Sequence, residues 1–380
     1  MLFAYQMVIC GILLLLLLIV LLNRHDFLPV PDGSPHQELP MISVLVPARN
    51  EERNIERCIR SLMQQSYPCY EIIVLDDGSA DATSSIVKQL QQSGGECVRL
   101  VEGAALPAGW HGKSWACYQL SQQARGAYLL FTDADTVHAP DSLFRSASAM
   151  QAKQAAMLSL APAQETGSFA ESLIVPLVYF VLASFLPTRL VSRSRNPAFS
   201  FANGQYIMFS REGYDLIGGH RAVRKAIVED VWLCMAVKKQ GGLVIAHNGM
   251  DLVRCRMYRS FHEVWSGFSK NIYAAMGYRR SAFLGMTTLT TAMYVVPPLW
   301  LLAALLEHRY TVEYFWLPLL QLLIAWASRF FVARQFKQAL PVLLLHPVSW
   351  AILMAISWNS FLSIHFGRGA EWKGRRYDFS

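Results

Sequence analysis

The pattern of apolar and polar residues divides the chain into a mixed central region and strongly apolar ends. Residues 1–23 include the run GILLLLLLIVLL and carry no charge before Arg24, so they approach the roughly 20 residues that a membrane-spanning helix needs. This stretch has no basic start and no small-residue cleavage site after Leu22. It therefore predicts an uncleaved membrane anchor rather than a signal peptide.

Three further apolar blocks lie between residues 281 and 366: FLGMTTLTTAMYVVPPLWLLAALL, YFWLPLLQLLIAWA and LPVLLLHPVSWAILMAISW. The first two predict two membrane spans from residue 283 to about 330. The third block, 339–362, has basic residues on both sides, so a single span would export the basic tail 367–380. A hairpin centred on Pro347 would keep this tail in the cytoplasm, and we favour the hairpin.

Basic residues crowd the flanks of these blocks, and the positive-inside rule assigns them to the cytoplasmic side. They are Arg24, Arg279, Arg280, Arg329, Arg334, Lys337, Arg368, Lys373, Arg375 and Arg376. We therefore expect a multi-pass protein of the cell membrane, with a linker at 24–40 and a cytoplasmic domain at 41–280. The net charge of +7 suits anionic lipid headgroups better than nucleic acid. The seven scattered cysteines lack a CxxC pair, which favours reduced thiols.

The central region alternates strand-like and helix-like segments. ISVLVPA (42–48), YEIIVLD (70–76) and YLLF (128–131) are short apolar runs, typical of buried strands. Helical spacing of apolar residues follows the first two, at 50–65 and 81–92. This order predicts an α/β fold with an open, mostly parallel sheet. Ligands bind such sheets at the carboxyl ends of the strands.

Polar residues stand at those strand ends. In PARNEE (47–52), Pro47, Ala48, Arg49 and Glu51 lie at the entry to a predicted helix, where backbone amides suit anions and polar groups can contact a base or ribose. An ordinary capped helix would give the same pattern.

The next strand ends in DDGS. The carboxylates of Asp76 and Asp77 can accept hydrogen bonds from ribose hydroxyls or a uracil N–H. A β-turn rich in Asp, Gly and Ser is the alternative. In GWHGKSWA (109–116), Lys113 offers an ammonium to a diphosphate or is simply a surface lysine, and the GxxxxGK spacing of a phosphate-binding P-loop is absent.

Two aspartates, Asp133 and Asp135, follow the strand YLLF in the segment DAD. Converging carboxylates at a strand end suit Mg²⁺ or Mn²⁺, which would also need substrate phosphates to complete its shell. His247 is a further candidate ligand, although a hydrogen-bonded histidine at a strand end explains it as well. Further along, Glu229 and Asp230 open an amphipathic helix, where an acid can serve as a general base or merely favour the helix dipole.

The series PARNEE, DDGS, DAD and VED resembles the inverting family 2 glycosyltransferases of GT-A fold, from residue 42 to about 275. Four finer segments are similar to bacterial membrane enzymes that glycosylate carotenoids. They are GWHGKSWACYQL, NGQ followed by GGH, RMYRSFHEVWSGFSKN (256–271) and GAEWKGRRY (369–377). Hopanoid-associated glycosyltransferases are more distantly similar.

The resemblance implies roles for the residues above. The PARNEE residues, Asp76, Asp77 and Lys113 would hold a nucleotide-sugar. Asp133 and Asp135 would bind a divalent cation and the donor diphosphate. Asp230, beside Glu229, would be the base. The QxxRW motif of processive synthases is absent, which implies addition of a single sugar.

We therefore expect a membrane-bound, metal-dependent inverting glycosyltransferase that transfers one hexose, first of all glucose from a UDP-sugar, to an apolar isoprenoid such as a carotenoid. A hopanoid, glycerolipid or polyprenyl phosphate is the alternative acceptor. A transporter or sensor would instead place charges within the spans, and the blocks 283–305 and 315–328 carry essentially none. The apolar segment 173–187 is open to two interpretations, a core helix or an interfacial helix that guides the acceptor.

Overall fold

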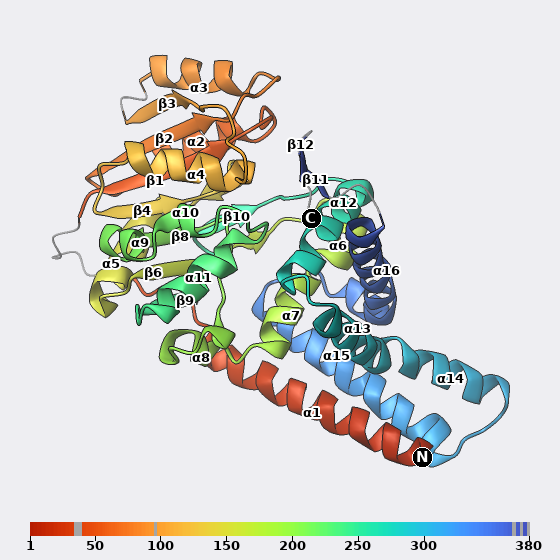
Figure 1. Ribbon diagram of the computed structural model, residues 1–380. Helices are drawn as coiled ribbons and strands as arrows, with labels where there is room; N and C mark the ends of the chain where they lie inside the picture. The colour runs from red at the N-terminus through yellow and green to blue at the C-terminus, as the bar shows by residue number, and fades with distance from the viewer. Residues whose placement is uncertain (34–39, 95–96, 367–369, 373–374, 378–380) are drawn as a thin grey trace. The chain divides into compact units, whose positions relative to one another are not determined.

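The structure is a computed structural model in which the chain forms two compact units (Figure 1). The helical unit contains residues 1–26, 166–188 and 258–380, and the sheet unit contains residues 27–165 and 189–257. The residues described are 1–33, 40–94, 97–366, 370–372 and 375–377. The predicted domain 41–280 differs from this division, because 166–188 and 258–280 group with the helical unit.

A seven-stranded sheet forms the centre of the sheet unit. Its order is β3 (Val98–Glu102), β2 (Tyr70–Asp76), β1 (Ile42–Ala48), β4 (Tyr128–Phe131), β8 (Ile207–Ser210), β6 (Met157–Ala161) and β9 (Val244–Asn248). The first four strands run parallel, β8 is antiparallel to both neighbours, and β6 pairs in parallel with β9. This mixed, mostly parallel sheet confirms the predicted α/β class.

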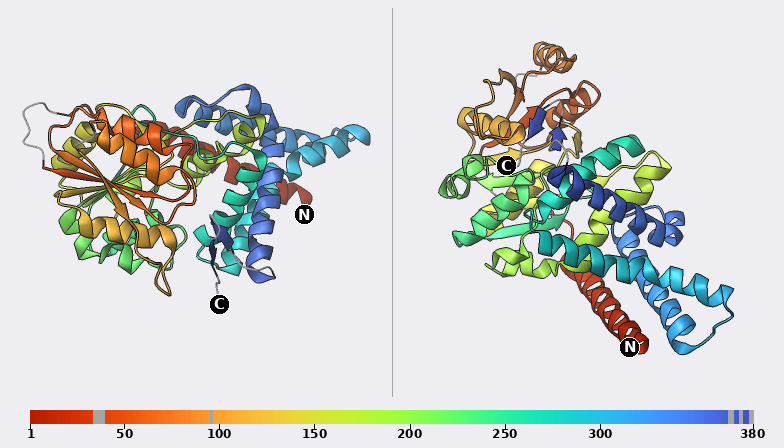
Figure 2. Two further views of the ribbon diagram at one scale, coloured as in Figure 1. Left: turned by 90° about the horizontal axis from the view of Figure 1, so that it is seen from above. Right: turned by 45° about the vertical axis from the view of Figure 1, so that its right-hand side comes forward.

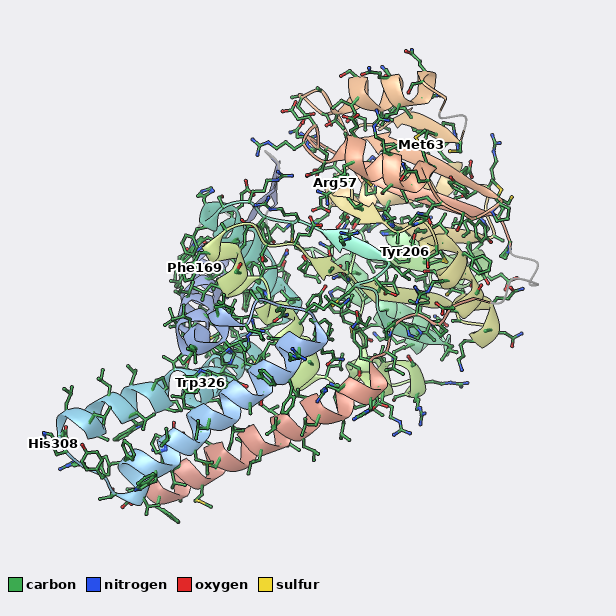
Figure 3. The ribbon with its side chains drawn as sticks, turned by 180° about the vertical axis from the view of Figure 1, so that it is seen from behind. Arg57, Met63, Phe169, Tyr206, His308 and Trp326 are labelled. Carbon is green, nitrogen blue, oxygen red and sulfur yellow. The ribbon has the colours of Figure 1, made fainter. Side chains whose placement is uncertain are left out.

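Helices cover both faces of this sheet, as the left view of Figure 2 shows. On one face α2 (Ile55–Met63), α3 (Thr83–Gln92) and α5 (Ser142–Lys153) pack over alternate strand residues such as Val44 and Val74. On the other, α4 (Gly112–Gln123) packs against β1 and β2. Tyr206, labelled in Figure 3, is fully buried. The remaining helices are α8 (Thr188–Arg193), η1 (Pro197–Phe199), α9 (Arg211–Leu216), α10 (Gly219–Ala222) and α11 (Glu229–Lys239).

The strand register brings the polar strand ends together. Ala48 lies opposite Asp76 in the β1–β2 pair, and β4 ends at Phe131 beside Leu45 of β1. A smaller sheet of β5 (Thr136–His138), β10 (Val253–Cys255) and β7 (Ala163–Gln164) continues directly from the DAD segment. The predicted helix at 50–65 begins only at Ile55.

The helical unit contains four helical segments that are long and apolar enough to cross a membrane: 2–26, 280–306, 312–335 and 341–365. Its elements are α1 (Leu2–Asp26), α6 (Phe169–Ile174), α7 (Leu177–Phe185), α12 (Phe261–Ala275), α13 (Arg280–Tyr294), α14 (Val296–Leu306), η2 (Val312–Trp316), α15 (Leu317–Gln335), η3 (Pro341–Leu345), α16 (His346–His365), β11 (Ala370–Trp372) and β12 (Arg375–Tyr377). Many large apolar side chains on these segments are exposed, among them Leu14, Leu18, Leu302 and Leu323.

Helix α1 packs along α15, and buried amides join the two helices. Gln321 Nε2 donates to Gln6 Oε1 over 2.7 Å. At the other end of α1, Asn23 is 2% exposed. Its amide donates to the carbonyl oxygens of Ala183 and Leu186 at 2.8 Å each, and its Oδ1 accepts from the N–H and hydroxyl of Thr188, also at 2.8 Å.

The hairpin that we predicted at Pro347 is wrong. Residues 346–365 form one continuous helix, α16, and Pro347 stands in its first turn. Proline is tolerated there because the first N–H groups of a helix have no intrahelical partner. Segment 173–187 forms the end of α6 and all of α7, which packs against α1 and α15 with most side chains buried. This burial favours the core-helix interpretation, although Val178 remains 43% exposed.

Candidate active site

Two loops meet at the carboxyl ends of β1 and β2. The guanidinium of Arg49 donates to the carbonyl oxygen of Asp77. Asn50 has a left-handed φ of 52°, a conformation that asparagine tolerates better than most residues. Its N–H donates to Ser79 Oγ over 3.0 Å, and its Oδ1 accepts from the N–H of Ala80 over 2.8 Å.

Two further bonds extend this contact. The N–H of Glu51 donates to Thr83 Oγ1 over 2.8 Å, and the N–H of Glu52 donates to Asp81 Oδ2 over 3.1 Å. Side chains of one loop thereby satisfy backbone groups of the other. The PARNEE and DDGS segments form one continuous polar edge.

Buried polar groups hold the DAD segment from the core side. Thr132 Oγ1 donates to the Gln205 carbonyl oxygen, and Thr136 Oγ1 donates to the Asp133 carbonyl oxygen, both over 2.7 Å. His138 Nε2 lies 2.9 Å from Thr136 Oγ1. Burial lowers the pKa of His138 to about 3, so its imidazole is neutral. These bonds fix the turn that carries Asp133 and Asp135.

Lys113 links the end of β4 to the start of α11. Its Nζ lies 2.8 Å from Asp133 Oδ1 and 3.0 Å from Glu229 Oε1. The Glu229 side chain is only 8% exposed, whereas those of Lys113 and Asp133 are 26% and 29% exposed. Two carboxylates thus share one ammonium, although they are almost a hundred residues apart in sequence.

Asp230 lies beside this network and is held by backbone N–H groups. Its Oδ2 accepts from the N–H of Gly204 over 2.9 Å, and its Oδ1 accepts from the N–H of Val231 over 2.8 Å. A β-carbon on Gly204 would stand 2.9 Å from Lys113 Nζ and 3.7 Å from Asp230 Oδ2. The absence of a side chain at position 204 therefore leaves room for the lysine.

Two carboxyl groups of this region have raised pKa values. Burial, with a contribution from Glu229, raises the pKa of Asp230 to about 7. Burial, followed by Asp133 and Glu51, raises the pKa of Asp135 to about 7. Such values near neutrality are typical of groups that exchange protons or gain a counter-ion during function.

The Asp133–Asp135 pair fits a hard divalent cation in part. Asp135 Oδ1 is buried and has no hydrogen-bond partner, which suits an oxygen that awaits a cation. The described residues include no group of three or more His, Cys, Asp or Glu side chains that could hold a metal ion. Two carboxylates are enough only if a ligand supplies the other oxygens, as phosphates do for Mg²⁺.

Comparison with known proteins agrees with this arrangement. Residues 43–218 match the model of glycosyl transferase family 2. This match covers a little under half of the chain and contains the PARNEE, DDGS and DAD segments. The 4,4'-diaponeurosporenoate glycosyltransferase of Staphylococcus aureus (strain MRSA252) is 28% identical over 346 residues, which cover 89% of this chain and 88% of the relative. The corresponding enzyme of strain USA300 is 27% identical over the same coverage.

A solved structure shares the fold of this glycosyltransferase. The mannosyltransferase from Pyrobaculum calidifontis, solved with GDP-Man and Mn²⁺, has a TM-score of 0.57 and 16% identity, and covers 96% of this chain and 98% of its own. The GT-A prediction is therefore confirmed.

The structure of the glycosyltransferase brings the candidate residues into two neighbouring groups. Arg49, Asp76 and Asp77, with the rest of PARNEE, lie at the edge formed by β1 and β2. Lys113, Asp133, Glu229 and Asp230 form the second group, with Asp135 two residues further along the DAD segment. The roles that the resemblance implies for these residues stay predictions.

Some residues that shape the candidate site could not be identified from the local sequence pattern. Gly204 and Gln205 belong to the NGQ segment, whose importance was predicted only by resemblance. Gln205 Nε2 donates to Cys255 Sγ over 2.9 Å, and strand pairing places Cys255 opposite Thr136. That pairing joins residues more than a hundred positions apart, so no local pattern could indicate it.

Other candidates lie elsewhere. His247 is on β9, where its Nδ1 stands 3.3 Å from the Leu28 carbonyl oxygen, which favours the strand-end interpretation over metal binding. Most of segment 256–271 belongs to α12, whose N-cap Ser260 accepts from the N–H of Glu263. Residues 369, 373 and 374 of GAEWKGRRY lie outside the described residues.

Proposed function

We propose that this glycosyltransferase is a membrane-bound inverting enzyme that transfers a single hexose, glucose from UDP-glucose being the first candidate, to an apolar isoprenoid such as a carotenoid. The observation that carries the proposal is the Asp133–Lys113–Glu229 network, because it sets the DAD segment directly beside Asp230. Sugar transfer needs the residues that bind the donor diphosphate close to the base that activates the acceptor, because both act on the same anomeric carbon.

The donor occupies the carboxyl edge of the sheet in this proposal. Asp76, Asp77 and the PARNEE residues Pro47, Ala48, Arg49 and Glu51 contact the nucleoside, and Lys113 contacts the diphosphate. Asp133 and Asp135 hold a divalent cation, Mg²⁺ or Mn²⁺, which stabilises the departing diphosphate when bound. The Mn²⁺ in the mannosyltransferase of the same fold supports this choice.

Asp230 acts as the general base. It takes the proton of an acceptor hydroxyl as the new bond from the acceptor oxygen to the anomeric carbon forms and the bond to the diphosphate oxygen breaks on the opposite face. Its pKa of about 7 suits a base that must be ionised yet able to accept a proton at neutral pH. A carboxyl acceptor is already ionised, so Asp230 contributes less to that reaction.

Two observations support the proposed acceptor class: the apolar helices of the chain and the names of its relatives. Four helical segments are able to span a bilayer, and the names of the Staphylococcus aureus relatives specify a carotenoid carboxylic acid. We place the protein in the cell membrane with its catalytic domain in the cytoplasm, where nucleotide-sugars and the flanking basic residues are both expected.

The test is a transfer assay with the full chain in detergent, in which product masses are measured for a panel of nucleotide-sugars and lipid acceptors. We expect a mono-hexosylated isoprenoid, formed only when a divalent cation is present. Hexosylation of a hopanoid, glycerolipid or polyprenyl phosphate instead would replace the isoprenoid assignment. No sugar transfer from any donor would contradict the enzymatic proposal.

Matched variants locate the reaction. Asp230→Asn is expected to lower the rate with a hydroxyl acceptor by about 10²–10⁴-fold, the usual contribution of a general base. Asp215→Asn, which changes an exposed acid on α9, is expected to leave the rate unchanged. Equal rates in both variants would remove Asp230 from the mechanism.

A further inference from the structure

Lys113 forms an ion pair with one of the two aspartates that are candidate ligands of a divalent cation. Its Nζ lies 2.8 Å from Asp133 Oδ1, so the ammonium compensates the charge of that carboxylate and competes with a divalent cation for it. Asp135, by contrast, keeps a buried Oδ1 without a hydrogen-bond partner. Asp133 is therefore already paired with the Lys113 ammonium, whereas Asp135 Oδ1 has no hydrogen-bond partner that a divalent cation would have to displace.

The second contact of Lys113 keeps its ammonium there. Glu229 Oε1 lies 3.0 Å from Nζ, and the Glu229 side chain is nearly buried. Gly204 leaves the space open, because a β-carbon at this position would lie 2.9 Å from Nζ. The lysine is thus built into a defined place between two strand-end loops and α11.

A divalent cation and this ammonium repel each other at such short range. Like charges a few ångströms apart interact strongly where solvent screening is reduced, and the Lys113 side chain is 26% exposed. A cation can bind both aspartates well only after Nζ has left Asp133. Among the described residues, the other ion pair of Nζ is with Glu229, so a new anion would compensate for the loss of the Asp133 contact.

We propose that Lys113 makes cation binding at Asp133 and Asp135 conditional on a bound nucleoside diphosphate. This inference rests on the proposed function, in which that diphosphate is part of the donor. The diphosphate oxygens attract Nζ away from Asp133, and the freed carboxylate then joins Asp135 in binding the cation. Nucleotide and cation therefore bind with positive coupling, and each strengthens the other by the same factor.

The test measures Mn²⁺ binding to the full chain in detergent, with and without UDP, by the electron paramagnetic resonance signal of free Mn²⁺. The Mn²⁺–UDP complex in solution is subtracted. We expect UDP to tighten Mn²⁺ binding to the wild-type protein about tenfold or more, within the usual range of coupling. In Lys113→Met, Mn²⁺ alone should bind about tenfold more tightly than to wild type. UDP should then tighten Mn²⁺ binding by a smaller factor than in wild type, because only the ligand oxygens of the diphosphate still contribute.

Three further variants separate charge, position and folding. Lys113→Arg keeps the positive charge and should keep the dependence on UDP. Lys88→Met removes an exposed lysine whose Nζ is 3.9 Å from Glu102, and should bind as wild type does. Lys113→Met combined with Glu229→Gln avoids an unpaired buried carboxylate, so it guards against misfolding and should still bind Mn²⁺ alone more tightly.

Unchanged or weaker Mn²⁺ binding by folded Lys113→Met, without UDP, would overturn the inference. So would an arginine variant that behaves like the methionine variant, or a wild-type affinity that UDP does not alter. A protein that shows the coupling but transfers no sugar would contradict the proposed function and leave the inference standing. A wild-type chain that binds neither UDP nor Mn²⁺ would contradict both.

Discussion

The N–H of Gly204 donates to Oδ2 of Asp230 over 2.9 Å, while the same glycine lies against the ammonium of Lys113. Gly204, which has no side chain, thus adjoins both the candidate base Asp230 and the Lys113 ammonium that pairs with Asp133. Backbone donors of this kind hold a carboxylate in a fixed orientation, because they cannot rotate away as a side chain can.

Gly204→Ala is accordingly expected to lower the transfer rate by about tenfold, the effect of roughly 1.4 kcal/mol on the barrier. The added methyl group would meet Lys113 Nζ at 2.9 Å and displace it. Fold stability should change little, because the end of a lysine side chain can move. Gly285→Ala is the control, since a β-carbon there meets nothing within 4 Å. Equal transfer rates of Gly204→Ala and Gly285→Ala would contradict the expectation that a methyl group at position 204 displaces Lys113.

The rate of transfer to a hydroxyl acceptor is expected to rise with pH up to about 7 and then level off. Asp230 must be ionised to accept a proton, and its pKa is raised to about 7 by burial and by Glu229. Below that value the active fraction falls about tenfold for each pH unit. The measurement is the pH profile of kcat, with the thermal midpoint followed at each pH. A profile that stays flat from pH 5 to 8 would be incompatible with Asp230 as the base.

The buried amide pair between α1 and α15 is expected to stabilise the helical unit. Gln321→Leu leaves the Gln6 amide without its 2.7 Å partner and should lower stability by about 1 kcal/mol, as for other hydrogen bonds between apolar helices. Leucine at both positions should recover part of that loss, because both buried amides are then removed, while the Glu313 carbonyl oxygen loses its 3.1 Å bond from Gln6 Nε2. The test is a double-mutant cycle on the thermal midpoint in detergent. A double variant less stable than either single variant would contradict this explanation.

The C-terminal tail is expected to lie in the cytoplasm despite the continuous helix α16. The tail carries Lys373, Arg375 and Arg376, which resist export. Helix α16 packs along α12, and Asn359 Nδ2 donates to Ser269 Oγ over 2.9 Å, so a polar contact joins the two helices. A fluorescent protein fused after residue 380 should therefore be fluorescent in the cytoplasm. Exclusive activity of a reporter that functions only outside the cytoplasm would identify α16 as a true span.

The sheet and its acid-tipped ends were predictable because each signal is local. YLLF followed by DAD marks a buried strand and its polar end within seven residues, and parallel pairing then brings such ends together. The salt bridges of Lys113 were not predictable, since they join α4 to residues at 133 and 229. The error at Pro347 has a similar origin: proline predicts both a turn and the first turn of a helix, and only the packing of α16 decides between them.

The four hydrogen bonds of Asn23 bear on how a water-soluble version of the enzyme should be made. Removing residues 1–26 would take away not only an apolar helix but also the partner of two carbonyl oxygens and of Thr188 at the start of α8. Those groups would be left unsatisfied at the point where the chain enters α8. Solubility is better sought by replacing exposed leucines of α1 with polar residues while Asn23 is kept, because its side chain satisfies polar groups of the chain that follows α7.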